Sequence, residues 1–309
     1  MPKVIHRQVL FAKKETTYGS DPTPTESANA IIAINPRVKE VFQAAERNLS
    51  LKTYSKKASL AGMKMIEVTF QTEIFGSGSV GTAPRVGALF QACGFSETVA
   101  ASSVTYAPAS SPISSCTLYF YLDGRRHKIL GAVGNVKLTL QAGQIGLAEW
   151  TMQGLYADPT DTALPSPTYE STTPPVCKAG TLSVNAVTSL IAEKIEIDMA
   201  NVISQRPSLS SSNALAGLFI TSRKPNLSFD PEMVNISDYD WRADVLASPR
   251  AFSYVLGATA GNILTLSAPK FNAVDIEYGD RDGIAIETIK GELASNSDAG
   301  DDELTLVYT

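Results

Sequence analysis

Alternating apolar and polar positions dominate the middle of the chain. In 136–141 every second side chain is apolar, so valine and leucine would point to one face and lysine, threonine and glutamine to the other. The segment 64–75 alternates in the same way through Ile66, Val68 and Phe70. A period of two is typical of a strand with one buried face. The pattern therefore predicts half-buried antiparallel strands.

Tight turns separate these strands. Asp123-Gly124 lies between the apolar run 118–122 and the segment 127–130. This dipeptide readily takes the positive φ angles of a two-residue hairpin. The whole stretch 118–156 is therefore predicted to be a series of antiparallel strands joined by turns.

The same stretch has an echo farther along the chain. The run FSYVL at 252–256 follows LYFYL at 118–122 by 134 positions, and Gly291 follows Gly154 by 137 positions. Upstream, Ser228-Phe229 follows Thr69-Phe70, and Gln205-Arg206 follows Glu46-Arg47, both by 159 positions. A repeat unit this long is a whole domain and not a solenoid module.

The echo divides the chain into parts. We expect an N-terminal arm with the first strand over 1–35, a first domain over 36–157, a linker over 158–180 and a second domain over 181–309. The linker is predicted to be extended because it is rich in proline. Its prolines are Pro159, Pro165, Pro167, Pro174 and Pro175.

Each domain is expected to carry one short flanking α-helix. In the first domain Pro84 suits the opening turn and Gly94 suits the end, with Leu89 and Phe90 between them on one face. In the second domain the expected helix opens at Ser237-Asp238 and carries Trp241, Val245 and Leu246. The predicted fold is mainly β, with two tandem sandwich domains.

Composition narrows the classes of function. The chain has 309 residues and a net charge of −5, so it lacks the basic surface of a nucleic-acid-binding protein. It has no apolar run long enough to span a membrane and no apolar signal core at its N-terminus, so we expect folding in a cytoplasm. Cys93, Cys116 and Cys177 have no metal-site spacing, and they are predicted to be buried thiols.

Three motifs suggest chemistry, and none is convincing. Gly76, Gly78 and Gly81 have the spacing of a dinucleotide-binding turn, but the strand before them alternates, whereas a Rossmann strand is apolar throughout. The segment 280–283 begins like a calcium loop, but its twelfth position is a glycine instead of a glutamate. His127 has no nucleophile elbow nearby. We therefore expect no enzyme activity and no catalytic, cofactor or metal site.

Several segments resemble one known family in their order and spacing. They are YGSDPTP at 18–24, FGSGSVGTAP at 75–84, LFQACGF at 89–95, TYAP at 105–108, LYFYLDG at 118–124 and DELTL at 302–306. Together they resemble the tail tube proteins of long-tailed bacteriophages, in the version with a duplicated domain. The resemblance spans most of the chain.

The resemblance implies a structural role in a virion. Domains of this family are β-sandwiches whose inner sheets join around a ring into a β-barrel, and DNA passes through its lumen at ejection. A duplicated chain implies rings of three chains with pseudo-sixfold symmetry. The implied partners are further copies of the chain, the tape measure protein, and terminator and baseplate proteins. Assembly would occur in the cytoplasm of the bacterial host, without a membrane. Mild acidity fits a lumen that does not retain DNA.

Long loops between the early strands of each domain would hold one ring to the next, together with the N-terminal arm. In this chain those loops are 44–62 and 204–213, and the match of Arg47 with Arg206 suggests that they share a role. The candidate contact residues are Arg47, Lys52, Tyr54, Lys56 and Lys57 in the first loop and Arg206, Ser208 and Ser210 in the second.

Two other interpretations remain open at this stage. The chain could be another tail component of the same fold, such as a terminator, a baseplate hub or a decoration protein. It could also be a carbohydrate-binding or hydrolytic β-sandwich, although its carboxylates are scattered along the sequence.

Overall fold

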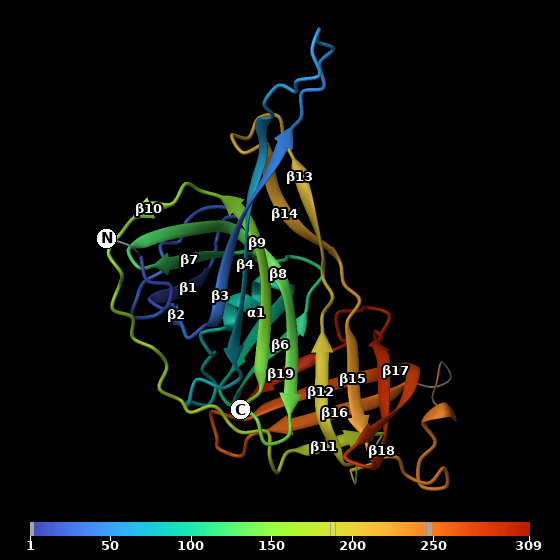
Figure 1. Cartoon of the computed structure of the whole chain (residues 1–309). Coiled ribbons are helices and arrows are strands. Elements are labelled where there is room, and N and C mark those ends of the chain that lie inside the picture. The colour runs from blue at the N-terminus through green and yellow to red at the C-terminus, as the bar shows by residue number, and fades with distance from the viewer. Residues whose placement is uncertain (1–2, 186, 189, 244, 246–248) are drawn as a thin grey trace.

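The protein is built mainly from β-strands, as the alternating pattern predicts (Figure 1). The computed structural model describes residues 3–185, 187–188, 190–243, 245 and 249–309. In those residues seventeen strands are hydrogen-bonded into one sheet system, and β13 and β14 form a separate two-stranded sheet.

The first half of the chain contains ten strands and one helix. The strands are β1 (Gln8–Lys14), β2 (Ala30–Ile31), β3 (Ile34–Ala45), β4 (Leu60–Glu73), β5 (Phe95–Ala100), β6 (Ser103–Pro108), β7 (Cys116–Leu122), β8 (Arg125–Gln141), β9 (Leu147–Tyr156) and β10 (Thr160–Asp161). The helix is α1 (Gly87–Ala92), which lies within the predicted segment.

The second half contains the remaining strands and a short helical turn. The strands are β11 (Thr181–Val184), β12 (Ala192–Asp198), β13 (Val202–Pro207), β14 (Leu215–Ser222), β15 (Asn226–Pro231), β16 (Arg250–Leu256), β17 (Leu264–Arg281), β18 (Ile284–Leu293) and β19 (Thr305–Tyr308). The turn is η1 (Trp241–Ala243).

The two halves follow the same order of strand pairing. In the first half β3 pairs with β4, β4 with β9 and β9 with β8. In the second half β12 pairs with β15, β15 with β18 and β18 with β17. The halves are joined because β8 also pairs with β12. One long sheet therefore runs from β3 to β17, and within the described residues it stays open at those two strands.

A second layer covers one face of this sheet in each half. The first part of β8 pairs with β7, and β7 pairs with β1. The first part of β17 pairs with β16, and β16 pairs with β11. Figure 1 shows β11 and β16 running across β12 and β15. The long strands β8 and β17 contribute to both layers, and each has a register shift against its neighbour in the long sheet.

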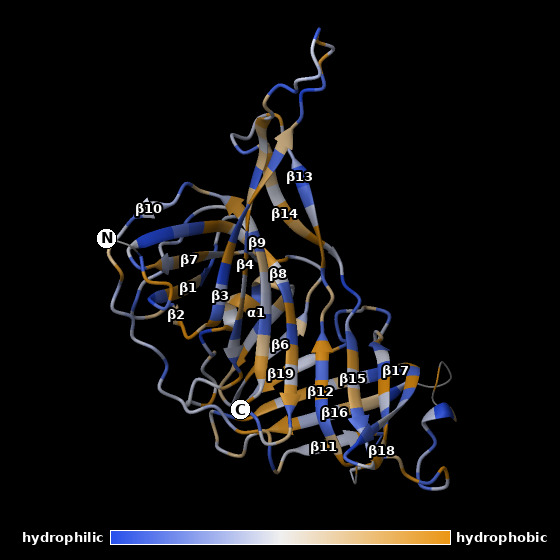
Figure 2. Ribbon diagram, viewed as in Figure 1, coloured by the Kyte–Doolittle hydropathy of each residue, from blue (hydrophilic) through white to orange (hydrophobic). Residues whose placement is uncertain are grey.

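Aromatic side chains fill the space between the layers. In the first half the ring centroid of Phe90, on α1, lies 5.0 Å from that of Trp150 on β9. In the second half Phe229 lies 5.4 Å from Trp241 and 5.6 Å from Phe252. These rings are buried, as are the inward positions of the alternating strands predicted from the sequence. Figure 2 shows the corresponding alternation of polar and apolar colours along β8 and β12.

The second predicted helix is corrected by the structure. In place of an α-helix from Ser237, the described residues form the three-residue 3-10 turn η1, and Leu246 lies outside them. The turn buries one large ring, that of Trp241, against Tyr239 and Phe229. A short 3-10 turn is sufficient to bury a single ring.

Parts of the expected arm, loops and linker belong to strands. Residues 44–45 and 60–62 of the expected first loop lie in β3 and β4, and residues 160–161 of the expected linker form β10. Residues 8–14 of the expected N-terminal arm form β1, which pairs with β7 along its whole length and is largely buried. Residues 204–207 of the expected second loop belong to β13. Among the described residues no helix is long and apolar enough to cross a membrane.

Candidate assembly surfaces

Two hairpins project together from one end of the molecule (Figure 1). The first is β3–β4 with its connecting loop 46–59, and the second is β13–β14 with its loop 208–214. One hydrogen bond joins the loop 208–214 to β4, and a second joins it to the neighbouring strand β9. The Lys64 amide donates to the Asn213 carbonyl at 3.2 Å, and Asn213 Nδ2 donates to the Tyr156 carbonyl at 2.8 Å.

An apolar cluster fixes the base of the two hairpins. Met65, Val133, Leu215 and Leu218 are buried against one another. Tyr18 adds a link from the N-terminal segment, because its hydroxyl accepts a hydrogen bond from the Leu218 amide at 2.7 Å. Burial raises the pKa of the Tyr18 hydroxyl above its usual value, although its contact with the Leu218 backbone acts in the opposite direction. The hairpins are therefore firmly attached to the folded body.

The predicted contact residues lie at the free ends of these hairpins. Arg47, Lys52, Tyr54, Lys56 and Lys57 all belong to the exposed loop between β3 and β4. This loop is the part of the chain that extends farthest from the sheets in Figure 1.

The candidates of the second hairpin lie on β13 and in the turn that follows it. Arg206 is on β13, with its guanidinium 5.9 Å from the ring centre of Phe219. The hydroxyls of Ser208 and Ser210 form a hydrogen bond of 2.9 Å in the loop, on either side of the exposed Leu209. The structure thus brings both sets to one end of the molecule, and their role in contacts between rings stays a prediction.

The contact between β8 and β12, here called the inner seam, joins the two halves within the long sheet. Lys137 on β8 is opposite Asp198 on β12, and Leu138 is opposite Ile197. The Lys137 ammonium lies 3.2 Å from the Glu196 carboxylate, and the Lys194 ammonium lies 2.8 Å from it. Burial raises the pKa of Glu196, but hydrogen bonds from both lysines outweigh this effect and hold the pKa below its usual value.

The contact between β6 and β19, here called the outer seam, joins the halves a second time. The last strand, β19, lies between β17 and β6. Leu306 is opposite Tyr106, and the rings of Tyr106 and Tyr308 meet edge to face at 6.1 Å. The first half therefore donates the β5–β6 hairpin to the layer that covers the second half.

The glycine-rich turn after β4 packs against the second half. The Gly78 amide donates to the Gly261 carbonyl at 3.0 Å, and the Gly76 amide donates to Asn262 Oδ1 at 2.8 Å. A Cβ on Gly261 would lie 2.6 Å from backbone atoms of Gly78 and Ser79. The glycines that suggested a dinucleotide site thus allow two backbones to approach closely.

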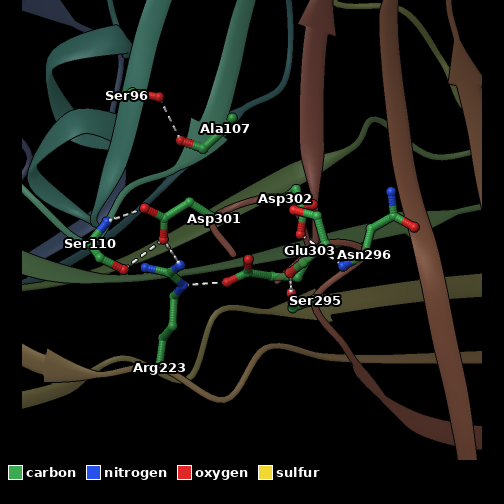
Figure 3. A network of polar contacts seen from close by, with 10 residues as sticks. Ser96, Ala107, Ser110, Arg223, Ser295, Asn296, Asp301, Asp302 and Glu303 are labelled. Atoms are coloured by element: carbon green, nitrogen blue, oxygen red, sulfur yellow. Dashed lines mark hydrogen bonds and ion pairs between the residues drawn. The ribbon is translucent and has the colours of Figure 1, made fainter. Parts of the chain in front are cut away.

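A polar network closes the same contact between the halves (Figure 3). The Arg223 guanidinium, after β14, pairs with the carboxylates of Asp301 and Glu303 near the C-terminus. Ser110, after β6, donates to Asp301 through its amide at 2.9 Å and its hydroxyl at 2.6 Å. Burial raises the pKa of Asp301, but the bonds from Ser110 and Arg223 outweigh it and lower the pKa.

The remaining motifs are parts of ordinary structure. The Gly283 amide donates to Asp280 Oδ1 at 2.8 Å in the turn between β17 and β18, as predicted. Cys93, Cys116 and Cys177 are buried and unpaired. No cluster of three or more metal-binding side chains is present in the described part of the chain.

Comparison with known protein families gives a match over nearly the whole sequence. A family model described as phage tail tube protein matches residues 6–306. The chain belongs to the phage tail tube protein family. A search of curated proteins gave no match. Tail tube proteins of this family are structural components of the phage tail, which agrees with the resemblance seen in the sequence.

The long sheet of this tail tube protein ends, within the described residues, in two unpaired strand edges. β3 pairs with β4 alone, and residues 275–281 of β17 pair with β18 alone. These are the two ends of the long sheet. Because an exposed edge presents unpaired amide and carbonyl groups to another strand, both edges are candidate contacts between copies of the tail tube protein.

One face of the long sheet is polar across its width, except near the projecting hairpins, where β14 packs on Met65, Val133 and Leu155. Cross-strand pairing places the following side chains on that face: Arg37, Lys39, Glu67, Thr69, Gln71, Lys137, Thr139, Glu149, Thr151, Gln153, Glu196, Asp198, Ser228, Thr288 and Lys290. The opposite face holds the aromatic core. The sheet therefore has one face available to water or to a lumen.

Some of these contacts were not evident in the sequence of the tail tube protein. The segment DELTL at 302–306 was singled out by resemblance, but nothing in it indicated that Glu303 would meet Arg223, which lies 80 positions away. The close approach of Gly76 and Gly261 was equally hidden, because the spacing of glycines does not name their partner.

Proposed function

We propose that this protein forms rings of three chains, which stack into the tail tube and serve as the conduit for DNA ejection. Each chain contributes two domains of common origin, 36–157 and 181–309, joined by the linker 158–180. Three chains then supply six similar domains to a ring with pseudo-sixfold symmetry. The inner seam between β8 and β12 is the observation that carries this proposal.

The inner seam supports this arrangement, because it offers a way for one such domain to join the next. It continues the sheet of the first half directly into the sheet of the second half. β3 and the end of β17 correspond to β12 and β8, the two strands of the inner seam. Their outer edges have no partner in the described residues. Pairing β3 of one copy with β17 of another would continue the sheet in the same direction. A head-to-tail contact of this kind closes into a ring when the rotation between copies permits it.

The polar face of the long sheet suits the lumen. If the sheet closes with its aromatic face against the outer layer, the polar side chains point inward. Acidic side chains outnumber cations on that face. They are Glu67, Glu149, Glu196, Asp198, Asp275, Glu277 and Glu292, against Arg37, Lys39, Lys137 and Lys290. Acidic side chains repel the phosphate backbone, and a lumen of this kind lets DNA slide without specific binding.

The paired hairpins would join one ring to the next. They project from one end of the molecule, and the loop 46–59 is exposed throughout. Leu49, Leu51 and Tyr54 are exposed apolar side chains within it. Burial of these side chains against a neighbouring ring would stabilise the stack. β1 belongs to the folded body, so we assign stacking to the loops and not to residues 8–14.

The wider setting follows from this role. The tube would enclose the tape measure protein and meet terminator and baseplate proteins at its ends, within the virion. Assembly would take place in the cytoplasm of the bacterial host. The inter-copy contacts are part of the proposal, and they are directly testable with the purified chain.

Electron microscopy of the purified protein tests the function. We expect concentrated protein to form tubes, with end views that show six domains per ring built from three chains. Mass measurement of isolated rings would count the chains. A chain that stays monomeric at high concentration, or rings with six chains, would contradict the proposal.

Removal of residues 50–57 tests the stacking loops. This segment lies outside the strands that flank it, so the fold should be kept. We expect rings but no tubes in electron micrographs. A second variant, with the same eight positions replaced by glycine and serine, keeps the loop length and should also fail to stack. Normal tubes from both variants would show that the loop is not the contact between rings.

A further inference from the structure

The edges that would meet between copies have counterparts in the inner seam, and the strand registers identify them. Phe70 and Phe229 occupy matched positions in the two halves, 159 residues apart. Phe70 is opposite Trp150, and Trp150 is opposite Val136. Phe229 is opposite Ile289, and Ile289 is opposite Ile276. Lys137 follows Val136 and Glu277 follows Ile276, so Glu277 is the counterpart of Lys137.

The same procedure relates β3 to β12. On the side of β4, Lys39 is opposite Glu67. On the side of β15, Asp198 is opposite Asn226, and Asn226 lies 159 residues after Glu67. Lys39 is therefore the counterpart of Asp198.

These counterparts carry opposite charges. In the inner seam Lys137 is opposite Asp198. We propose that Lys39 on β3 of one copy pairs with Glu277 on β17 of a second copy, in the antiparallel register of the inner seam but with its charges reversed. This inference rests on the proposed ring, and it identifies the contact through which the ring closes.

The surroundings of both edges favour this pairing. Arg37 and Lys39 are the exposed cations on the polar face of β3. On β17, Asp275, Glu277 and Asp280 are all exposed, and the nearest cation, Lys290, pairs with Glu277 at 2.9 Å. Arg281 is already engaged by the Asp230 carboxylate at 2.7 Å.

The end of β17 therefore keeps an excess of negative charge. The edge of β3 is positive, which makes the two edges complementary. Opposite charges across paired strands stabilise a sheet, whereas like charges directly opposite destabilise it.

Exposed aromatic side chains at both edges also favour a second copy as the partner. Tyr278 on β17 is 68% exposed, whereas its counterpart Leu138 on β8 is 3% exposed beneath the inner seam. Phe42, near the end of β3, is 50% exposed. A second copy seated on these edges would continue the sheet and remove part of this apolar surface from water.

The reversed charges would also prevent incorrect pairing. A second β3 brought to the edge of β8 would oppose Lys39 to Lys137. A second β12 brought to the edge of β17 would oppose Asp198 to Glu277. Like charges at these positions disfavour exchange of strands between the two kinds of seam. The chain thus distinguishes the contact within itself from the contact with its neighbour.

Cysteine pairs test the register. The native cysteines are buried, so K39C/E277C provides the accessible thiols. We expect oxidation to link neighbouring copies covalently, with a closed species of three chains on a denaturing gel. The control K39C/R281C fits a register shifted by four residues and should remain unlinked. Linking of the control in place of the first pair would overturn the proposed register.

Charge reversal tests the electrostatic selection. K39E and E277K each place like charges in the contact and should weaken ring assembly about tenfold, whereas K39E/E277K should restore it. Circular dichroism checks that each monomer is folded. Equal assembly by all four proteins would overturn the inference while the proposed ring stands. Absence of rings from the unmodified protein would instead refute the proposed function.

Mixing the single variants gives an independent readout. K39E has glutamate at both contact positions, and E277K has lysine at both. Opposite charges therefore meet only where a K39E chain neighbours an E277K chain. A ring of three cannot close by strict alternation, so a mixed ring keeps two matched contacts and one like-charge contact. We expect the mixture to close rings less well than the natural protein but better than either variant alone. A mixture that closes rings no better than either variant alone would contradict charge selection at this contact.

Discussion

Single residues set how closely the two halves of this tail tube protein approach. Gly261 has φ of +81° and lies against the backbone of Gly78. A side chain there would need both a strained backbone and space that the opposite turn occupies. Glycines in such turns are therefore structural residues of the contact between the halves.

Substitution of Gly261 separates these two effects. G261A should lower the free energy of unfolding by about 3 kcal/mol, from the positive φ and the backbone clash together. The control G300A has φ of +71° with no atom within 4 Å of an added Cβ, so it should lose only about 1 kcal/mol. Urea unfolding measures both values. Equal losses would show that the contact with Gly78 yields without cost.

Strand pairs join the halves at the scale of elements. The inner seam combines backbone pairing with the ion pairs of Glu196, and the outer seam inserts β19 beside β6. Both seams connect residues that are far apart in the sequence, so they depend on the completed fold. The inner seam also supplies the pattern from which the contact between chains is inferred.

Acid should weaken the inner seam through Glu196. The pKa of this carboxyl is lower in the folded chain than in the unfolded chain, so its contribution is present above the unfolded value and is lost as pH falls through the folded value. At pH 7, E196Q should lower the free energy of unfolding by about 1 kcal/mol or less, because the ion pairs of Glu196 are partly exposed. The difference should begin to shrink as pH falls to about 4.3, the unfolded value, and should disappear below the lower folded value. Urea unfolding between pH 3 and pH 7 measures it, and a difference independent of pH would rule out the ion pairs as its cause.

The described part of the molecule presents one polar face, the two free edges of the long sheet and one projecting end. These three surfaces match the three contacts that a tube requires, namely those with the lumen, with the neighbour in the ring and with the next ring. In the proposed tube, charge on the polar face would decide whether DNA is retained.

Retention of DNA tests the assignment of the lumen. Tubes of the natural protein should hold no duplex DNA at about 0.15 M salt, whereas E67K/E149K tubes should hold it, because the reversed charges attract phosphate. The control D161K/D298K adds the same charge at exposed positions away from the polar face. Binding can be followed by sedimentation with labelled DNA, and electron microscopy shows whether the DNA lies inside. Equal retention by the two variants would place Glu67 and Glu149 outside the lumen.

The sequence by itself determined the class of fold, the inward positions of the main strands and the family. Alternation predicted that Val136, Leu138 and Leu140 are buried, because a strand repeats every two residues whatever its partners are. It also predicted the turn at Asp280 and the burial of the three cysteines. It predicted an α-helix near Trp241, where a shorter turn was sufficient.

Only the tertiary structure decided which segments meet. The pairing of β8 with β12, the place of β19 beside β6 and the contact of Gly76 with Gly261 join residues far apart in the sequence. Local patterns record which face of a strand is apolar, but they do not specify the strand that lies beside it. The unpaired edges of β3 and β17, and hence the surfaces proposed for assembly, became visible only once the order of strands in the long sheet was known.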